Sequence, residues 1–537
     1  MRNTILIYLL LCAVVFAQEK KEEKQGIELP DFVITGMQSV NMPEMSKIRP
    51  KVISTLSKEF FNPEFSPEEL TLGSISEPDI KHAEEEAVAN PNNGKVKVGA
   101  GFYTLPEGML HYSKSFGNVL VSTQVWGGNE KAHVDNSGYN YSGGTVNTEF
   151  FVSNNSPIIP GLRVGLDAFY AREDYKFYGA LIPDEIRKKE KINFGLFLAN
   201  HKDSHIKFKS GAGMDMTRLP NEGDGESYSD NLLNINGNVD LSLSSFSVRS
   251  EAEYIIQNLS GAAGGKSGSN YFAAKSLLYY RPTVRFSISA GVFFSGTSGN
   301  SMIGPVVNLK LKLTDELSIM GAYSTESNFY TSKDFLGTNR FIDINGMPAN
   351  IFERKPGSVK LAASYAYNKY FEIISGLEVS NIDNHHYFMD GDNNGKFEIA
   401  SIDDYKFSHL FFQTNFHLGP FGIFYGEVNY FMYNLDGVDR LPYEPDMTFY
   451  GRYGYEFLPG FTGELGLNFR GEVWANEAGT KTLDPVVNVL AGIKYNYLSG
   501  LTFYASLENL LGRKDENWYK YQEKPFDISA GIEYRWK

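Results

Sequence analysis

Acidic side chains alternate with asparagine and glycine in a run of six residues, DGDNNG, that begins at Asp390. Carboxylate and amide oxygens at alternate positions, followed by a glycine that permits a sharp turn, are typical of the first half of a calcium-binding loop. The twelfth position is Ser401 rather than a bidentate glutamate, although Asp403 follows closely. Ordinary turn chemistry in a long loop is the alternative interpretation of this run. The calcium interpretation predicts a site in loop 382–404 formed by Asp390, Asp392, Asn394 and Asp403.

Two adjacent histidines, His385 and His386, precede this run and follow Asp383. Imidazole nitrogens are common ligands of transition metals. Successive side chains of an extended chain point to opposite faces, so neighbouring imidazoles at the end of a strand are expected to diverge. The sequence therefore argues against a metal ion shared by these two residues.

Motifs that mark catalytic centres are missing from the sequence. It contains no P-loop, no HExxH and no GxSxG. No trio of serine, histidine and aspartate stands out as a hydrolytic site. We therefore expect a protein that is not an enzyme.

The elements that must position these loop residues are indicated most clearly by the last dozen residues, 526–537. Side chains alternate between the two faces of a strand, and here one face is apolar while the other is polar or small. The apolar face carries Phe526, Ile528, Ala530, Ile532, Tyr534 and Trp536, and the opposite face carries Asp527, Ser529, Gly531, Glu533 and Arg535.

The same alternation recurs about 22 times between Lys95 and the C-terminus, each time over the roughly 9–11 residues that a tilted strand needs to cross a bilayer. Short turns alternate with longer loops, among them those near 217–231, 327–354 and 382–404. The sequence therefore predicts an all-β fold, a transmembrane antiparallel up-and-down β-barrel in residues 95–537. An even number of strands with short periplasmic turns places both chain ends in the periplasm.

The composition agrees with a barrel in a membrane. Aromatic residues make up 14% of the chain, with 33 Tyr and 39 Phe, as expected for aromatic girdles at two bilayer interfaces. Mean hydropathy is only −0.29, because a barrel strand places an apolar side chain at every second position. A net charge of −14 argues against nucleic acid as a partner.

The chain begins with features of a secretory signal peptide, namely Arg2, an apolar stretch and a small-residue cleavage site that ends at Ala17. Residues 18–94 show no barrel-like alternation and are expected to form a periplasmic segment. The predicted domains are thus a signal peptide at 1–17, this segment at 18–94 and the barrel at 95–537, located in the outer membrane and surrounded by its lipid.

Two short segments resemble the TonB-dependent receptors, a family of outer-membrane transporters with a plugged lumen. Apolar strand-forming residues between a proline and a glycine resemble the TonB box, and the stretch LENLLGRK at 507–514 is similar to the C-terminal region of that family. By this resemblance, residues 29–36 engage the periplasmic TonB protein by strand addition. The coupling residues it implies are Asp31, Phe32, Val33, Ile34, Thr35 and Gly36.

The resemblance implies uptake of a scarce small-molecule or oligomeric ligand that binds at the extracellular loops. The plug of this family exceeds a hundred residues, whereas only 37–94 are available here. We therefore expect this shortened segment, with the 327–354 loop folded inward, to fill the lumen. A non-transporting surface-binding or scaffold barrel derived from the family, and a passive channel, are the alternatives. Apart from calcium, no cofactor is expected.

Overall fold

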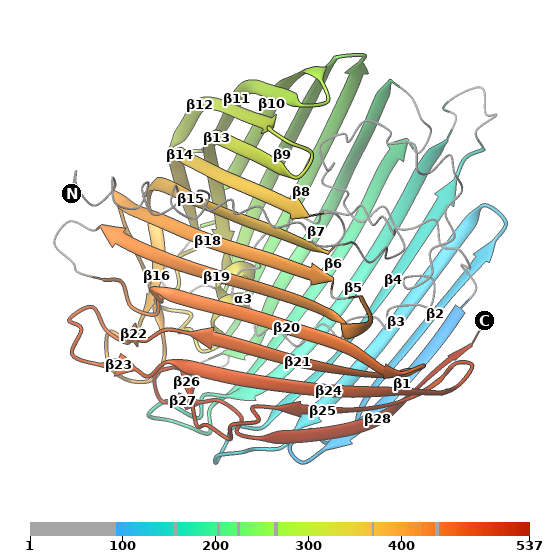
Figure 1. The fold of residues 1–537 in the computed structure, drawn as a ribbon. Helices are drawn as coiled ribbons and strands as arrows, with labels where there is room; N and C mark the ends of the chain where they lie inside the picture. Colours follow the sequence, from blue (N-terminus) through green and yellow to red (C-terminus); the bar gives the residue numbers. More distant parts are fainter. Residues whose placement is uncertain are drawn as a thin grey trace, which may run out of the picture. The chain divides into compact units, whose positions relative to one another are not determined.

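The computed structural model describes residues 93–153, 159, 161–200, 205–222, 226–261, 267–367, 370–417, 419–434 and 440–536. The predicted signal peptide at 1–17 and the TonB-box-like stretch at 29–36 lie outside the described residues. The same holds for the predicted lumen segment 37–94 except its last two residues, which begin the first barrel strand. The described part forms a closed antiparallel barrel of 22 strands, which confirms the predicted fold class (Figure 1).

The barrel strands follow one another around the sheet in chain order. They are β1 (Asn93–Gly101), β2 (Glu107–Phe116), β3 (Val119–Glu130), β4 (Tyr139–Phe151), β5 (Leu162–Lys176), β6 (Ile186–Asn200), β7 (Ile206–Glu222), β8 (Glu226–Leu243), β9 (Phe246–Ser260), β10 (Asn270–Thr283), β11 (Phe286–Thr297), β12 (Ser301–Lys312), β13 (Leu317–Thr331), β14 (Asn350–Tyr367), β15 (Phe371–Asp383), β18 (Tyr405–His417), β19 (Ile423–Asn434), β20 (Met447–Leu458), β21 (Phe461–Arg470), β24 (Val486–Leu498), β25 (Leu501–Glu508) and β28 (Asp527–Trp536).

The longer loops carry structure of their own. Three small hairpins lie in the loops after β15, β21 and β25, and a short helix lies in the loop after β13. These elements are β16 (His385–Met389) with β17 (Glu398–Ile402), β22 (Val473–Trp474) with β23 (Thr482–Leu483), β26 (Glu516–Trp518) with β27 (Tyr521–Gln522), and α3 (Ser332–Thr338). The turn after β18 contains a single 3-10 turn, η1 (Gly419–Phe421). No helix among the described residues is long and apolar enough to span a membrane.

Pairing of the first and last strands closes the barrel. Gly94 of β1 lies opposite Trp536 of β28, and the register continues to Gly101 opposite Ser529. In Figure 1 the blue strand β1 and the red strand β28 accordingly lie side by side. Since the barrel sheet has no open edge, each of its 22 strands has two hydrogen-bonded neighbours, as a spanning sheet in lipid requires.

The alternation of side chains on the last strand is as predicted. Ile528, Ile532 and Tyr534 are exposed on the outer face, whereas Asp527 is buried. On other strands, lumen-facing charges pair with each other. Glu464 lies 2.8 Å from the Arg452 guanidinium and 3.5 Å from the Lys494 ammonium. A register slip of one residue would turn such basic groups into lipid, at a cost of about 2–4 kcal/mol each near the midplane.

Strand lengths differ around the barrel, which corrects one predicted loop. β7 continues to Glu222 and β8 starts at Glu226, so most of the predicted loop 217–231 is paired strand. β8 has 18 residues, several more than the roughly 9–11 that cross a bilayer. The long-loop ends of β5–β8 therefore extend beyond the membrane, where their inner faces are available to contact the loops.

Candidate functional site

Residues 332–349 connect β13 to β14 and contact barrel strands that are not adjacent to β13 or β14. Buried side chains of β6 hold the backbone of this loop. Arg187 donates from Nη1 to the carbonyl oxygen of Ile342 at 2.6 Å, and Lys189 donates from Nζ to that of Leu336 at 3.2 Å. Because buried carbonyls need donors, these long cationic side chains fix the loop inside the barrel mouth. Within the predicted 327–354 loop, residues 332–349 fold inward as expected, whereas 327–331 and 350–354 continue the paired strands β13 and β14.

Both ends of this loop are tied to β8 and β9. Asp230 of β8 accepts hydrogen bonds from the backbone N–H of Ser332 at 3.2 Å and from the Gln257 amide at 3.1 Å. Gln257 of β9 donates in turn to the carbonyl oxygen of Ala349 at 2.8 Å and accepts from the Asn350 amide at 2.7 Å. This network joins the start of the loop to its end, so that the loop is held as a unit.

Helix α3 starts at a defined local signal. The backbone N–H of Thr331 donates to the Asp334 carboxylate at 2.8 Å, as in a capping box. Phe335 and Leu336 on this helix are about 1% exposed and belong to the hydrophobic cluster of the loops. The helix is therefore stabilised by its cap and by burial rather than by its length, which is only seven residues.

The loops share one hydrophobic core at the long-loop end of the barrel. Phe341 stacks on Tyr521 of β27 with ring centroids 3.6 Å apart, and Phe397 next to β17 forms a bridge with Ile342. The Arg187 guanidinium lies 4.5 Å from the ring centroid of Phe177 in the loop after β5. We call these packed segments the loop cap. Its segments are residues 177–185, 332–349, 384–404, 471–485 and 509–526.

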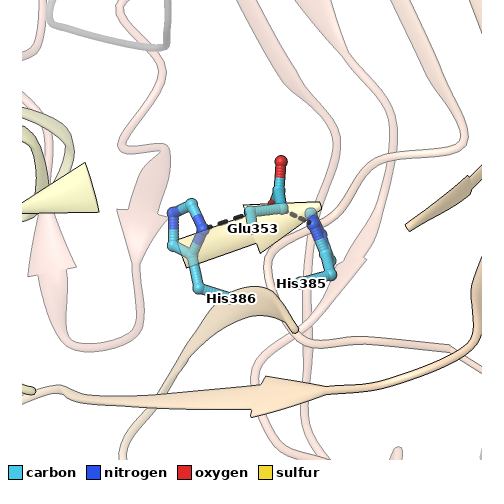
Figure 2. A group of neighbouring side chains, drawn as sticks. All are labelled: Glu353, His385 and His386. Carbon is cyan, nitrogen blue, oxygen red and sulfur yellow. Dashed lines mark hydrogen bonds and ion pairs between the residues drawn. The ribbon is translucent and has the colours of Figure 1, made fainter. Parts of the chain in front are cut away.

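A carboxylate–imidazole cluster lies where the loop cap meets β14 (Figure 2). Glu353, only 2% exposed, is 2.8 Å from Nδ1 of His385 and 3.7 Å from Nδ1 of His386, both through Oε2. Nε2 of His385 lies 2.8 Å from Oε1 of Glu444, whose other oxygen accepts from the Tyr405 hydroxyl. One buried glutamate thus faces two imidazoles, and a further glutamate orients one of them.

Electrostatics at His385 reflect this enclosure. Burial lowers the pKa of His385, but the Glu444 and Glu353 carboxylates more than offset burial and raise the pKa to about 9. The His385 ring also stacks on Tyr405, with centroids 4.1 Å apart and planes 11° apart. The site therefore favours a positive charge between the two carboxylates.

The expectation that the two imidazoles diverge is wrong at their nitrogens. The two rings do pack on different aromatic neighbours. His385 stacks on Tyr405, whereas the ring centroid of His386 lies 4.3 Å from that of Tyr330. Both Nδ1 atoms nevertheless turn toward the same oxygen of Glu353. Residue Glu353 was missed because it stands on β14, 32 positions before His385, and no local pattern connects the two.

The structure separates the predicted calcium residues. Asp390 closes the hairpin turn by accepting the N–H groups of Asn394 at 2.9 Å and Gly395 at 3.1 Å. Asp403 lies at the base of the same hairpin, where it accepts the N–H of Asn384 at 2.9 Å. The five residues of β16 lie between tip and base, about 13 Å at the usual strand rise. A site that uses Asp390 and Asp403 together is therefore not formed.

A different carboxylate lies near the tip of this hairpin. Burial and the neighbouring carboxylates of Asp392, Asp343 and Asp390 raise the pKa of Glu398. Sequence reasoning missed Glu398, although its position eight residues after Asp390 placed it on the returning strand of the hairpin. The calcium prediction stays a prediction for Asp390, Asp392 and Asn394. The TonB-coupling residues 31–36 lie outside the described part of the chain.

Comparison with known proteins gives matches in fold alone. No protein-family model and no curated protein sequence matches the chain. The siderophore receptor PiuA from Acinetobacter baumannii matches with a TM-score of 0.62 at 13% identity, over 83% of this chain and 82% of that one. A point mutant of the ferric enterobactin receptor PfeA from Pseudomonas aeruginosa matches with a TM-score of 0.65 at 10% identity, over 83% and 80%. The FrpB iron transporter from Neisseria meningitidis matches with a TM-score of 0.64 at 10% identity, over 84% and 82%.

At these identities the likeness shows the architecture. The fold is a 22-strand antiparallel barrel of the outer-membrane type, the one found in these receptors and in the transporter. Barrels of this strand number have a lumen wide enough to need filling. In this chain the loop cap packs across the long-loop end.

Proposed function

We propose that this protein is an outer-membrane receptor that binds a scarce solute at its long-loop end and imports it with energy supplied through TonB. The observation that carries this proposal is the loop cap, which packs across one end of a 22-strand barrel. A mouth held by buried hydrogen bonds suits gated uptake and does not suit free diffusion. The similarity in fold to siderophore receptors and an iron transporter supports the same class of function.

In this proposal the loops face the exterior, and the chain is exported by its signal peptide. Residues 29–36 add as a strand to the periplasmic TonB protein, so main-chain hydrogen bonds carry the contact. Binding at the cap would have to alter the contacts of residues 332–349, since Arg187, Lys189 and Asp230 hold this loop to the barrel wall.

A surface-binding barrel that does not transport is the second candidate. It is favoured by the hydrophobic core of the loop cap, because a core of this kind stabilises a permanently closed mouth. The two candidates differ in one property, namely coupling to TonB. An open passive channel requires a free mouth and is the least compatible with the loop cap.

The test is binding of the purified protein to the periplasmic domain of TonB, measured by biolayer interferometry in detergent. Proline at Val33 removes a backbone donor and fixes φ, so we expect a loss of at least about tenfold in affinity. Proline at Val40, outside the TonB-box-like stretch, is the matched control and should bind like the unaltered protein. Equal binding by the Val33 and Val40 variants, or none by the unaltered protein, would favour the surface-binding candidate.

A further inference from the structure

Three potential ligand atoms converge at the join between β14 and the loop cap. One ring nitrogen each of His385 and His386 and a carboxylate oxygen of Glu353 lie within 4.8 Å of one another (Figure 2). Both Nδ1 atoms face Oε2 of Glu353. Nδ1 of His386 is buried and has no hydrogen-bond partner among the described residues. The Glu353 carboxylate lies 3.7 Å away, within ion-pair range but too far for a hydrogen bond, so this buried nitrogen approaches a carboxylate without the hydrogen bond that buried polar atoms normally make.

We propose that Glu353, His385 and His386 bind a divalent late transition-metal ion of the Zn²⁺ type. Two imidazoles and one carboxylate are the ligand chemistry of such ions, whereas Ca²⁺ prefers oxygen ligands alone. Metal–ligand bonds of about 2.0–2.1 Å place tetrahedral ligand atoms about 3.3 Å apart. The separations of 2.8 and 3.7 Å from Glu353 to the two imidazoles lie on either side of that value.

The surroundings of His385 match a metal-bound imidazole. Its second nitrogen, Nε2, lies 2.8 Å from the Glu444 carboxylate, and Glu444 is itself held by the Tyr405 hydroxyl. A carboxylate that accepts the N–H of Nε2 fixes the tautomer in which Nδ1 carries a lone pair for the metal, and it makes the imidazole a stronger ligand. Because Glu353 is almost fully buried, its charge also needs a close cation.

A bound ion would have a defined structural effect. Glu353 belongs to β14, whereas His385 and His386 belong to β16 in the loop cap. The metal therefore cross-links the barrel wall to the 384–404 loop. Three protein ligands leave the fourth position of a tetrahedral ion open to water or another donor. This inference rests on the cluster geometry and does not depend on the proposed uptake function.

The experiment measures Zn²⁺ binding by the full chain in detergent after chelator treatment and desalting. Stoichiometry comes from elemental analysis, affinity from competition with a chromogenic chelator, and ligand geometry from the visible spectrum of the Co²⁺ form. We expect one tightly bound ion and a four-coordinate Co²⁺ spectrum. His386→Phe keeps a ring of similar size against Tyr330 but removes the ligand nitrogen, so affinity should fall at least about 100-fold. Glu444→Gln weakens the orientation of His385 and should cost about 10- to 100-fold.

The control is His417→Phe, which removes an imidazole at the other end of β18 and should bind Zn²⁺ like the unaltered protein. Heat-modifiable migration on gels checks that each variant is folded. No stoichiometric binding by the folded, unaltered protein would overturn the proposal, leaving an imidazolium–carboxylate cluster only. Equal affinity of the unaltered protein and His386→Phe would also overturn it, since the ion would then bind elsewhere.

Discussion

Arg187 is the side chain whose loss should release the loop cap most directly. Replacement by methionine keeps the apolar stem and removes the guanidinium that donates to Ile342 at 2.6 Å and to Arg340 at 3.3 Å. The carbonyl of Arg340 keeps a second donor, the Tyr175 hydroxyl at 2.7 Å. The main loss is therefore the hydrogen bond to Ile342, together with the cation–π contact to Phe177.

The magnitude follows from these contacts. A hydrogen bond from a charged donor contributes about 1.5–3 kcal/mol, and the cation–π contact of a buried guanidinium adds about 1 kcal/mol. Since Arg187 is only 2% exposed, solvent screening reduces these values little. We expect the closed form of residues 332–349 to lose about 2–4 kcal/mol relative to an opened form. That difference corresponds to about a 30- to 700-fold increase in the opened population.

The assay is amide hydrogen exchange of residues 332–349 followed by mass spectrometry in detergent. Exchange of this loop in Arg187→Met should accelerate by the same factor, while amides of β11 and β12 stay protected. Arg187→Lys keeps the positive charge but loses the forked donors of the guanidinium, so its loop amides should exchange at a rate between those of the unaltered protein and Arg187→Met. Arg535→Met, at a half-exposed arginine of β28, is the matched control and should leave the loop unchanged. Unchanged protection of the loop in Arg187→Met would refute the reasoning.

Three further predictions follow from other contacts. Phe341→Ala removes the ring stacked on Tyr521 and should cost about 3–5 kcal/mol of loop-cap stability. Proteolysis of the 332–349 loop should therefore be faster than in the unaltered protein, and equal cleavage rates would contradict the packing. Added Ca²⁺ should protect the 384–404 loop from protease, and the double variant Asp390→Ala with Asp392→Ala should lose this protection. Identical cleavage with Ca²⁺ and with chelator would show that the DGDNNG run is an ordinary turn. Ile532→Lys places a charge on the lipid face and should destabilise the barrel by up to about 2–4 kcal/mol, whereas Ser529→Lys on the lumen face should cost less. Heat-modifiability gels compare the two variants, and a less stable Ser529→Lys barrel would refute the assigned faces.

The barrel could be predicted from the sequence because its signal is local. A period of two in residues such as Ile528, Ile532 and Tyr534 depends only on neighbours along one strand. The misread loop 217–231 has an equally local cause. Pro220 and the GDG run that follows it are typical of a long loop, yet the strands pair around them with a register irregularity, where a proline is tolerated.

The loop cap and its cluster could be predicted only in part. The inward fold of the 327–354 loop followed from the need to fill a wide lumen, but its partners did not. Arg187 and Ile342 are 155 positions apart, and only the closed sheet brings them together. The shared approach of His385 and His386 to Glu353 likewise depends on the pairing of β14 with β15, which carries the following hairpin to that glutamate. Alternation along one strand contains no information on such contacts.

The central claim is that the loop cap closes the long-loop end of the barrel, and thiol labelling of intact cells tests it most directly. In a Cys12→Ser background the chain has no other cysteine, so a single introduced thiol reports on its own position. Leu181→Cys, at a residue 76% exposed in the loop cap, is the positive control for labelling by a bulky, membrane-impermeant maleimide. Asn193→Cys lies on the lumen face of β6, deeper along the strand than the loop-cap contact Lys189. We predict that the thiol at position 181 is labelled and the thiol at 193 is not; labelling of both at similar rates would contradict a closed mouth.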